Sequence, residues 1–117
     1  MKRLQMAVLA LAPVSLPAQE IPRIEHQPPA CVLKDRFWQL EAVLQPPELV
    51  TRSRLYFTAP GAEDYYYVEM AAAENGQWLA RLPKPKADQV SYFLEVLSPG
   101  GELQRTPETR LAVVKDA

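Results

Sequence analysis

Two side chains with the right chemistry for nucleophilic catalysis lie close together near the start of the chain. His26 is the only histidine and Cys31 the only cysteine, and they are five residues apart. An imidazole that activates a thiol is a recurrent arrangement in covalent catalysis. Pro28 and Pro29 separate the two residues, however, and no hydrolase motif surrounds either of them. We therefore predict that His26 is a surface or packing residue and that the chain is not an enzyme.

The same scarcity argues against a metal or cofactor. One histidine and one cysteine are too few for an ordinary zinc site. Glu63 and Asp64 are adjacent acids, but calcium requires six or more oxygen ligands. Gly100 and Gly101 follow a proline and indicate a turn rather than a phosphate-binding loop. We expect no metal and no cofactor.

A hairpin over residues 53–70 is the strongest structural signal in the chain. Its two arms are rich in aromatic and β-branched residues, and the turn between them spans residues 59–64. Side chains alternate between the two faces of a strand, which predicts one buried and one outward set. The predicted inward set is Leu55, Phe57, Tyr66, Val68 and Met70. The predicted outward set is Tyr56, Thr58, Tyr65, Tyr67 and Glu69.

Further strands are predicted before and after this hairpin. A proline-rich lead-in around Ile21 and Ile24 is typical of an edge strand. The remaining strand candidates are residues 37–44, 77–82, 90–97 and 103–106, with a short edge strand at 111–114. Asn75-Gly76 is a strong turn signal, because both residues tolerate positive φ. About seven short strands without a convincing helix predict an all-β, antiparallel two-sheet sandwich.

The first 18 residues have the pattern of a secretory signal peptide. Lys2 and Arg3 precede a short apolar run over residues 6–11, and small residues lead to a cleavage site after Ala18. The alternative is an uncleaved amphipathic start or a disordered tail. The run is too short to span a bilayer. We expect a single domain over residues 19–117, exported to the periplasm or the extracellular space without a stable membrane anchor.

Charge and cysteine content limit the classes of partner. Removal of residues 1–18 would leave 11 basic and 14 acidic residues, a net charge of −3. A mildly acidic domain without a basic cluster is a poor candidate for binding nucleic acid. A single cysteine excludes an internal disulfide, so the fold must depend on packing. Cys31 is then either a buried or half-buried thiol, or pairs with another chain.

Several strand patterns together resemble the immunoglobulin-like and fibronectin type III-like domains of exported bacterial proteins. The segments that carry the resemblance are Arg54–Phe57, Tyr66–Met70, Trp78–Pro83, Val90–Val96, Gly100-Gly101 and Arg105–Glu108. The resemblance implies that Tyr92 is a corner tyrosine whose hydroxyl ties the preceding loop to its strand. It also implies that Trp38 or Trp78 lies in the core. The cysteine pair of antibody domains is absent.

The predicted outward aromatic residues are the candidate binding site. Tyr65, Tyr67 and Phe93 would lie on one sheet face, where aromatic rings favour protein or sugar contacts. Alternatively, a loop or the N-terminal segment covers them, or they only brace cross-strand pairs. We expect a non-catalytic interaction module that binds an envelope protein through this face or an edge strand. A carbohydrate- or cell-wall-binding accessory domain is the alternative.

Overall fold

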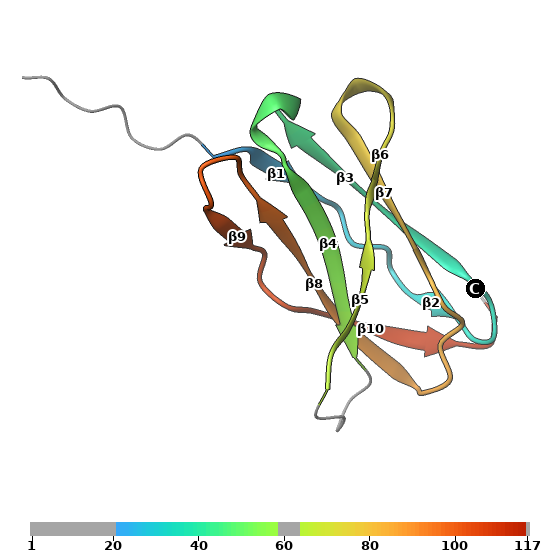
Figure 1. Cartoon of the computed structure of the whole chain (residues 1–117). Coiled ribbons are helices and arrows are strands. Elements are labelled where there is room, and N and C mark those ends of the chain that lie inside the picture. Colours follow the sequence, from blue (N-terminus) through green and yellow to red (C-terminus); the bar gives the residue numbers. More distant parts are fainter. Residues whose placement is uncertain (1–20, 59–63, 117) are drawn as a thin grey trace, which may run out of the picture.

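The computed structural model describes residues 21–58 and 64–116 of the chain. This part is all-β: ten strands form two sheets that face each other (Figure 1). The predicted signal peptide falls within residues 1–20, outside the described residues, as does most of the predicted hairpin turn. Among the described residues, no helix has the length and apolar character needed to cross a membrane.

The smaller sheet has four strands in the order β1-β3-β7-β6. Their bounds are Arg23–Glu25 for β1, Trp38–Gln45 for β3, Gln77–Leu82 for β7 and Ala71–Ala72 for β6. β3 and β7 form the long antiparallel pair at its centre, with Trp38 opposite Leu82 and Val43 opposite Gln77. β1 pairs only with the end of β3, from Val43 to Gln45. The lead-in is therefore an edge strand, as its prolines predicted.

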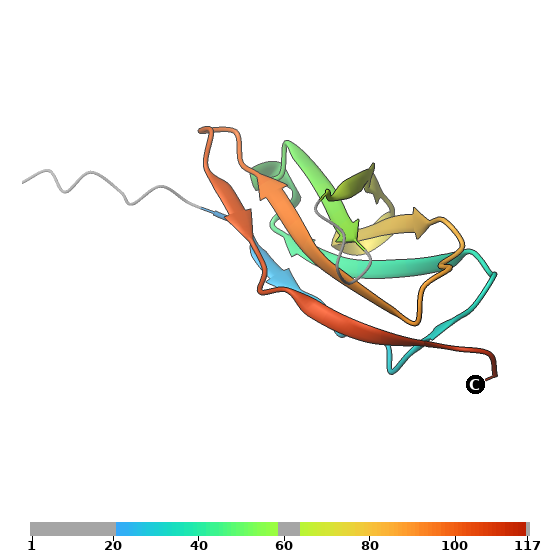
Figure 2. The same cartoon turned by 90° about the horizontal axis from the view of Figure 1, so that it is seen from below.

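The larger sheet has six strands and follows the order β2-β10-β8-β4-β5. Their bounds are Val32–Leu33 for β2, Thr109–Val114 for β10, Gln89–Leu97 for β8, Arg52–Thr58 for β4 and Tyr66–Glu69 for β5. The sixth strand, β9 (Leu103–Arg105), pairs with the second half of β8. The view in Figure 2 shows how strongly this sheet twists around the smaller one.

Turn chemistry at one end of the molecule follows the sequence signals. A short 3₁₀ turn, η2 (Pro47–Leu49), joins β3 to β4. A second, η3 (Glu74–Gly76), joins β6 to β7. Asn75 and Gly76 have φ values of 57° and 76°, so both adopt the left-handed conformation that the Asn-Gly signal predicted.

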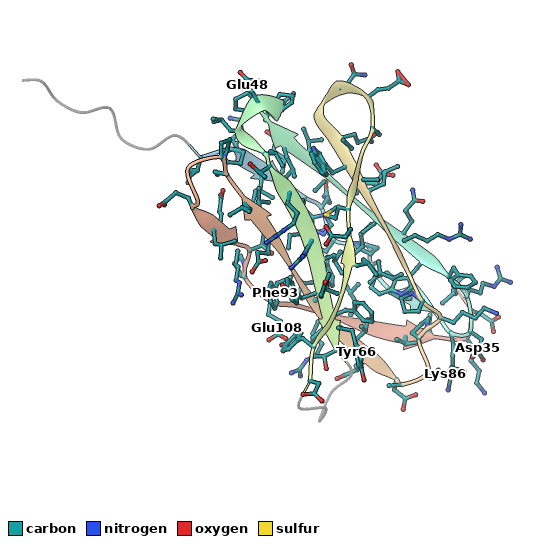
Figure 3. The ribbon with its side chains drawn as sticks, in the orientation of Figure 1. Asp35, Glu48, Tyr66, Lys86, Phe93 and Glu108 are labelled. Atoms are coloured by element: carbon teal, nitrogen blue, oxygen red, sulfur yellow. The ribbon has the colours of Figure 1, made fainter. Side chains whose placement is uncertain are left out.

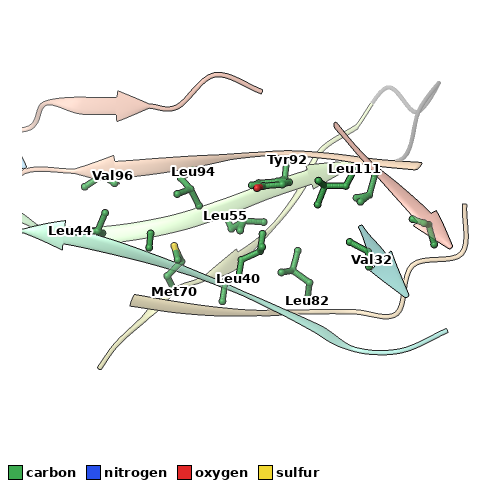
Figure 4. Close-up of a cluster of buried hydrophobic side chains, with 14 residues drawn as sticks. Val32, Leu40, Leu44, Leu55, Met70, Leu82, Tyr92, Leu94, Val96 and Leu111 are labelled. Atoms are coloured by element: carbon green, nitrogen blue, oxygen red, sulfur yellow. The ribbon is translucent and has the colours of Figure 1, made fainter. Parts of the chain in front are cut away.

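The core lies between the two sheets and is built from alternate residues of their strands. Leu44 of β3 faces Leu55 of β4 and Leu94 and Val96 of β8, and all four are fully buried (Figure 4). Tyr92 is also enclosed, with 1% of its surface exposed. Trp38 and Trp78 are both partly buried against this cluster, so each contributes to the core.

Three expectations about the strands were wrong. The chain has ten strands rather than about seven in its described part, because two-residue strands such as β2 and β6 are too short to show alternation. β2 pairs with β10 in parallel, so the sheets are not purely antiparallel. β10 is not an edge strand, since it lies between β8 and β2.

Tyr66 also departs from its prediction. It alternates with Val68 and Met70 as expected, yet 65% of its surface is exposed, whereas Met70 is buried. Its neighbour across the sheet is Phe57, at the end of β4. Alternation predicted the side of the sheet correctly, but Tyr66 lies at the end of the interface between the sheets, where its ring is only partly covered.

We predict that Leu94→Ala lowers the free energy of unfolding by about 3 kcal/mol, because it leaves a cavity in a fully buried site. Chemical denaturation followed by tryptophan fluorescence measures this change. Leu103→Ala is the matched control: Leu103 is 56% exposed, so its truncation should cost less than about 0.5 kcal/mol. Equal losses in the two variants would contradict the proposed core.

Candidate functional site

A row of aromatic rings crosses the outer face of the larger sheet. Tyr67 of β5, Tyr56 of β4 and Phe93 of β8 lie opposite one another in register. The Tyr56 and Phe93 rings are stacked, with centroids 5.1 Å apart, and Tyr67 lies 5.5 Å from Tyr56. Tyr65 approaches the same group, 5.5 Å from Phe93. The structure thus brings the three predicted site residues together around Tyr56.

Tyr56 was missed as a site residue, although its outward direction was predicted. Alternation in the first hairpin arm placed it opposite Leu55 and therefore outside. Alternation within one strand does not predict the register between β4 and β8, and this register places Tyr56 directly beside Phe93. Register between strands far apart in sequence depends on the whole sheet.

A row of alternating charge lies next to the aromatic row. In register across four strands it runs Glu69, Arg54, Glu95 and Arg105. Arg54 Nε donates to Glu69 Oε2 at 2.7 Å, and Arg105 Nε donates to Glu95 Oε2 at 2.9 Å. Opposite charges placed directly across a sheet attract each other, so this row stabilises the strand register.

The arginines also cover the rings. The Arg54 guanidinium carbon lies 4.2 Å from the centre of the Tyr67 ring, and that of Arg105 lies 5.3 Å from Phe93. These are favourable cation–π contacts. Phe93 is half-buried among Arg105, Tyr56 and Tyr65, whereas Tyr65 and Tyr67 keep 42% and 49% of their surface exposed. Phe93 therefore supports the face, and the two tyrosines are its accessible part.

Tyr65 is itself anchored at its polar end. Its hydroxyl donates a hydrogen bond to Glu108 Oε2. Glu108, labelled in Figure 3, lies in the segment between β9 and β10. This hydrogen bond to a carboxylate is the main cause that raises the pKa of Tyr65, and partial desolvation of the hydroxyl adds to it. The tether holds the ring of Tyr65 against Phe93 and leaves the other side of the ring open to solvent.

Strand β5 is the edge of the larger sheet, and its outward backbone groups can be identified. The amide of Met70 donates to the carbonyl of Ser53 at 2.9 Å. In an antiparallel pair, hydrogen-bonded positions alternate, so Val68 and Tyr66 also bond toward β4. The N–H and C=O groups of Tyr67 and Glu69 therefore point away from the sheet. Residues 65–69 contain no proline or lysine that would block pairing with another strand.

His26 connects the two sheets. Its Nδ1 lies 2.6 Å from the carbonyl oxygen of Glu41 on β3, and its Nε2 lies 2.7 Å from the hydroxyl of Tyr92 on β8. Because a carbonyl only accepts, Nδ1 donates to Glu41, and in the tautomer with its proton on Nδ1, Nε2 accepts from the tyrosine. The prediction that the Tyr92 hydroxyl binds the loop before its strand was wrong. The hydroxyl instead bonds to His26 in the N-terminal segment.

This arrangement also separates the two candidate catalytic residues. Both ring nitrogens of His26 are engaged, and within residues 21–58 and 64–116 the half-buried Cys31 makes no hydrogen bond to it. In the described part of the chain, no three acidic, histidine or cysteine side chains lie close enough together to hold a metal ion.

A shallow groove of about 780 Å³ lies beside the His26 segment. It is bounded by residues 24–29 on one side and by 39–43 of β3 on the other. The chain leaves β3 after Glu25, which pairs with Val43, so residues 39–42 of β3 have no paired strand on that side among the described residues. The bond from His26 to Glu41 already uses one of its carbonyls, which makes this edge less available than β5.

No family model and no curated protein matches this chain. Solved structures with a similar fold include the cycloalternan-degrading enzyme of Trueperella pyogenes. Its complex with isomaltose matches 76% of this chain at 18% identity and a TM-score of 0.62, and its complex with cycloalternan matches the same share at 15% and 0.63. An engineered protein matches 84% of the chain at 14% identity and a TM-score of 0.59.

The matched regions are small parts of those proteins. This chain spans 14% and 17% of the two enzyme chains and 21% of the engineered one. At this level of identity, the likeness concerns the all-β fold alone.

We predict that the stability of the domain falls as the pH rises from about 10 to 12, through ionisation of Tyr92. Burial raises the pKa of Tyr92 to about 12, and a hydrogen bond from Thr109 opposes part of this increase. A pKa higher in the folded than in the unfolded state stabilises the fold below pH ~10, and this contribution of about 2 kcal/mol is lost as the pH passes 12.

Urea denaturation at pH 9 and at pH 11.5 would measure this loss. Between these two pH values the free energy of unfolding should decrease less in Tyr92→Phe than in the parent chain. In Tyr66→Phe, which changes an exposed ring, it should decrease as much as in the parent chain. If all three chains lost the same stability, ionisation of Tyr92 would not be the cause.

We also predict that Glu95→Ala lowers the free energy of unfolding by about 2 kcal/mol. The Glu95 side chain is 5% exposed and is bonded to Arg105, with Arg52 Nη2 at 3.9 Å, so its removal leaves two cations without their partner. Glu25→Ala, which breaks the exposed Arg23–Glu25 pair, should cost less than about 0.5 kcal/mol in the same denaturation experiment. A cost for Glu95→Ala as small as for Glu25→Ala would contradict a structural role.

Proposed function

We propose that this chain is an exported, non-catalytic interaction module of the immunoglobulin-like or fibronectin type III-like class. The strand order supports the fold assignment. In the immunoglobulin scheme one sheet has the order A-B-E-D and the other G-F-C-C′. Here the corresponding orders are β1-β3-β7-β6 and β10-β8-β4-β5. The pattern of residues 1–18 is the argument for export.

The partner of this module is an extended segment of another protein, bound along β5. Strand addition to an open edge uses main-chain hydrogen bonds for affinity and neighbouring side chains for specificity. The observation that carries this proposal is the edge itself: it presents outward backbone groups at Tyr67 and Glu69 and exposed rings at Tyr65 and Tyr67. Tyrosine and arginine are the residue types enriched at protein interfaces.

Carbohydrate binding is the second candidate. The likeness to a cycloalternan-degrading enzyme solved with bound isomaltose favours it. Sugar stacking needs open aromatic faces, however, and Arg54 and Arg105 cover the Tyr67 and Phe93 rings on one side. We therefore place a protein partner first.

A proline at Glu69 tests the edge without disturbing the pairing with β4. The Glu69 amide points outward, so Glu69→Pro removes one donor from the edge, whereas Glu69→Ala removes the same carboxylate and keeps the donor. We expect Glu69→Pro to reduce partner recovery by at least about fivefold, the equivalent of one hydrogen bond of about 1 kcal/mol. Tyr65→Ser/Tyr67→Ser should reduce it as well, and Glu69→Ala should not.

The measurement is quantitative mass spectrometry of proteins crosslinked to each immobilised variant in a bacterial envelope extract. Circular dichroism melts of every variant show whether it is folded. Identical protein sets on all baits would refute the β5 interface. Retention of glycan or wall fragments alone, lost with the tyrosines, would favour the carbohydrate function.

A further inference from the structure

A second potential binding site lies at one end of the two sheets, away from the outward backbone groups of β5. It is a cavity of about 170 Å³ with an apolar, aromatic lining. The residues that line it include Trp38, Phe57, Tyr66, Pro83, Pro85 and Val90, together with Lys84 and Lys86. Small-molecule sites usually measure about 300–1,000 Å³, so this cavity suits one large side chain better than a metabolite.

The walls of the cavity are held by contacts within the domain. Trp38 Nε1 donates to the carbonyl of Pro83 at 3.1 Å, which fixes the indole against the loop after β7. The amide of Asp35 donates to the carbonyl of Pro85 at 3.3 Å and joins the same loop to the turn before β3. The Tyr66 ring, 6.1 Å from that of Phe57, forms the exposed side. The cavity is therefore preformed.

The rim of the cavity is positively charged. Lys84 and Lys86 line it, and no lining residue is acidic. Figure 3 shows Lys86 and Asp35 at the same end of the molecule, opposite Glu48. The two segments at this end, residues 34–36 and 81–86, contain one acidic residue, Asp35, and five of the chain's 13 basic residues: Lys34, Arg36, Arg81, Lys84 and Lys86.

In the part of the chain that the structure describes, none of these five cations forms an ion pair with a carboxylate. Among the described residues, the ion pairs use Arg23, Arg52, Arg54 and Arg105, and none involves the five basic residues at this end. Arg81 and Lys84 instead lie over the exposed ring of Phe37, at 5.1 and 5.3 Å. In a chain with a net charge of −1, this concentration of unpaired positive charge favours an acidic partner.

We propose that this cavity binds one bulky apolar or aromatic side chain presented by an acidic segment of a protein partner. The side chain enters between Trp38, Phe57 and Tyr66, and flanking carboxylates approach Lys84 and Lys86. The site is independent of strand addition at β5, because Tyr66 bonds its backbone toward β4 and contributes only its ring.

Blocked pentapeptides test this proposal on the full chain. The probe has tryptophan between two pairs of glutamates, and two matched peptides replace the tryptophan by alanine or the glutamates by lysines. Amide chemical shifts are followed by NMR at low ionic strength. We expect saturable shifts around Tyr66, Lys84 and Val90 with the first peptide, and at least about tenfold weaker binding of the other two. Added salt should weaken binding, because the charges are exposed.

Variants distinguish this site from the β5 edge. Tyr66→Ser and Lys84→Ser/Lys86→Ser should each weaken binding of the probe by about fivefold or more, whereas Tyr67→Ser and Glu69→Pro should leave it unchanged. Equal binding of the alanine peptide, shifts confined to the outer face, or an unaffected Lys84→Ser/Lys86→Ser variant would each overturn the proposal. A dimer in sedimentation that Tyr66→Ser converts to a monomer would place a second copy of the chain at the cavity and would also overturn the proposal.

Discussion

The structure depends on the burial of both faces of β8. Strands in a two-layer fold usually have one solvent-exposed face, but in β8 the outward-facing Ser91 and Glu95 are buried, like the inward Tyr92 and Leu94. A buried carboxylate is tolerated only when it is paired, and Glu95 is held by Arg105 and Arg52. The charge row and the cation–π contacts above the sheet follow from this requirement. The side chains of the charge row cover the outer face of β8.

This cover explains why the accessible groups lie at the borders of the domain. In the centre of the outer face, arginines and carboxylates neutralise each other and shield the rings beneath them. At the β5 edge the tyrosines are still exposed. At the end formed by residues 34–36 and 81–86, the cations form no ion pair with any carboxylate among residues 21–58 and 64–116. An interface placed at either border would leave the packing of β8 intact.

The N-terminal segment is the other long-range element. After β1 leaves the smaller sheet, His26 bonds to both sheets, and the chain then joins the larger sheet as β2, parallel to β10. A single side chain with two ring nitrogens can bridge a backbone carbonyl and a tyrosine hydroxyl at once. The only histidine, which sequence chemistry first suggested as a catalytic candidate, therefore has a clear structural role.

The sequence by itself determined the outward direction of Tyr65, Tyr67 and Phe93. It also determined the strands with regular alternation, predicted at 37–44, 77–82 and 90–97 and found within one residue of these bounds. These features depend on period-two alternation and on turn residues such as Asn75 and Gly76, which are local. Only the tertiary structure decided that Arg105 covers Phe93, that Tyr66 is exposed, and that β2 is parallel to β10. These depend on register and on which sheet a strand joins, and both are set by contacts between residues distant in the chain.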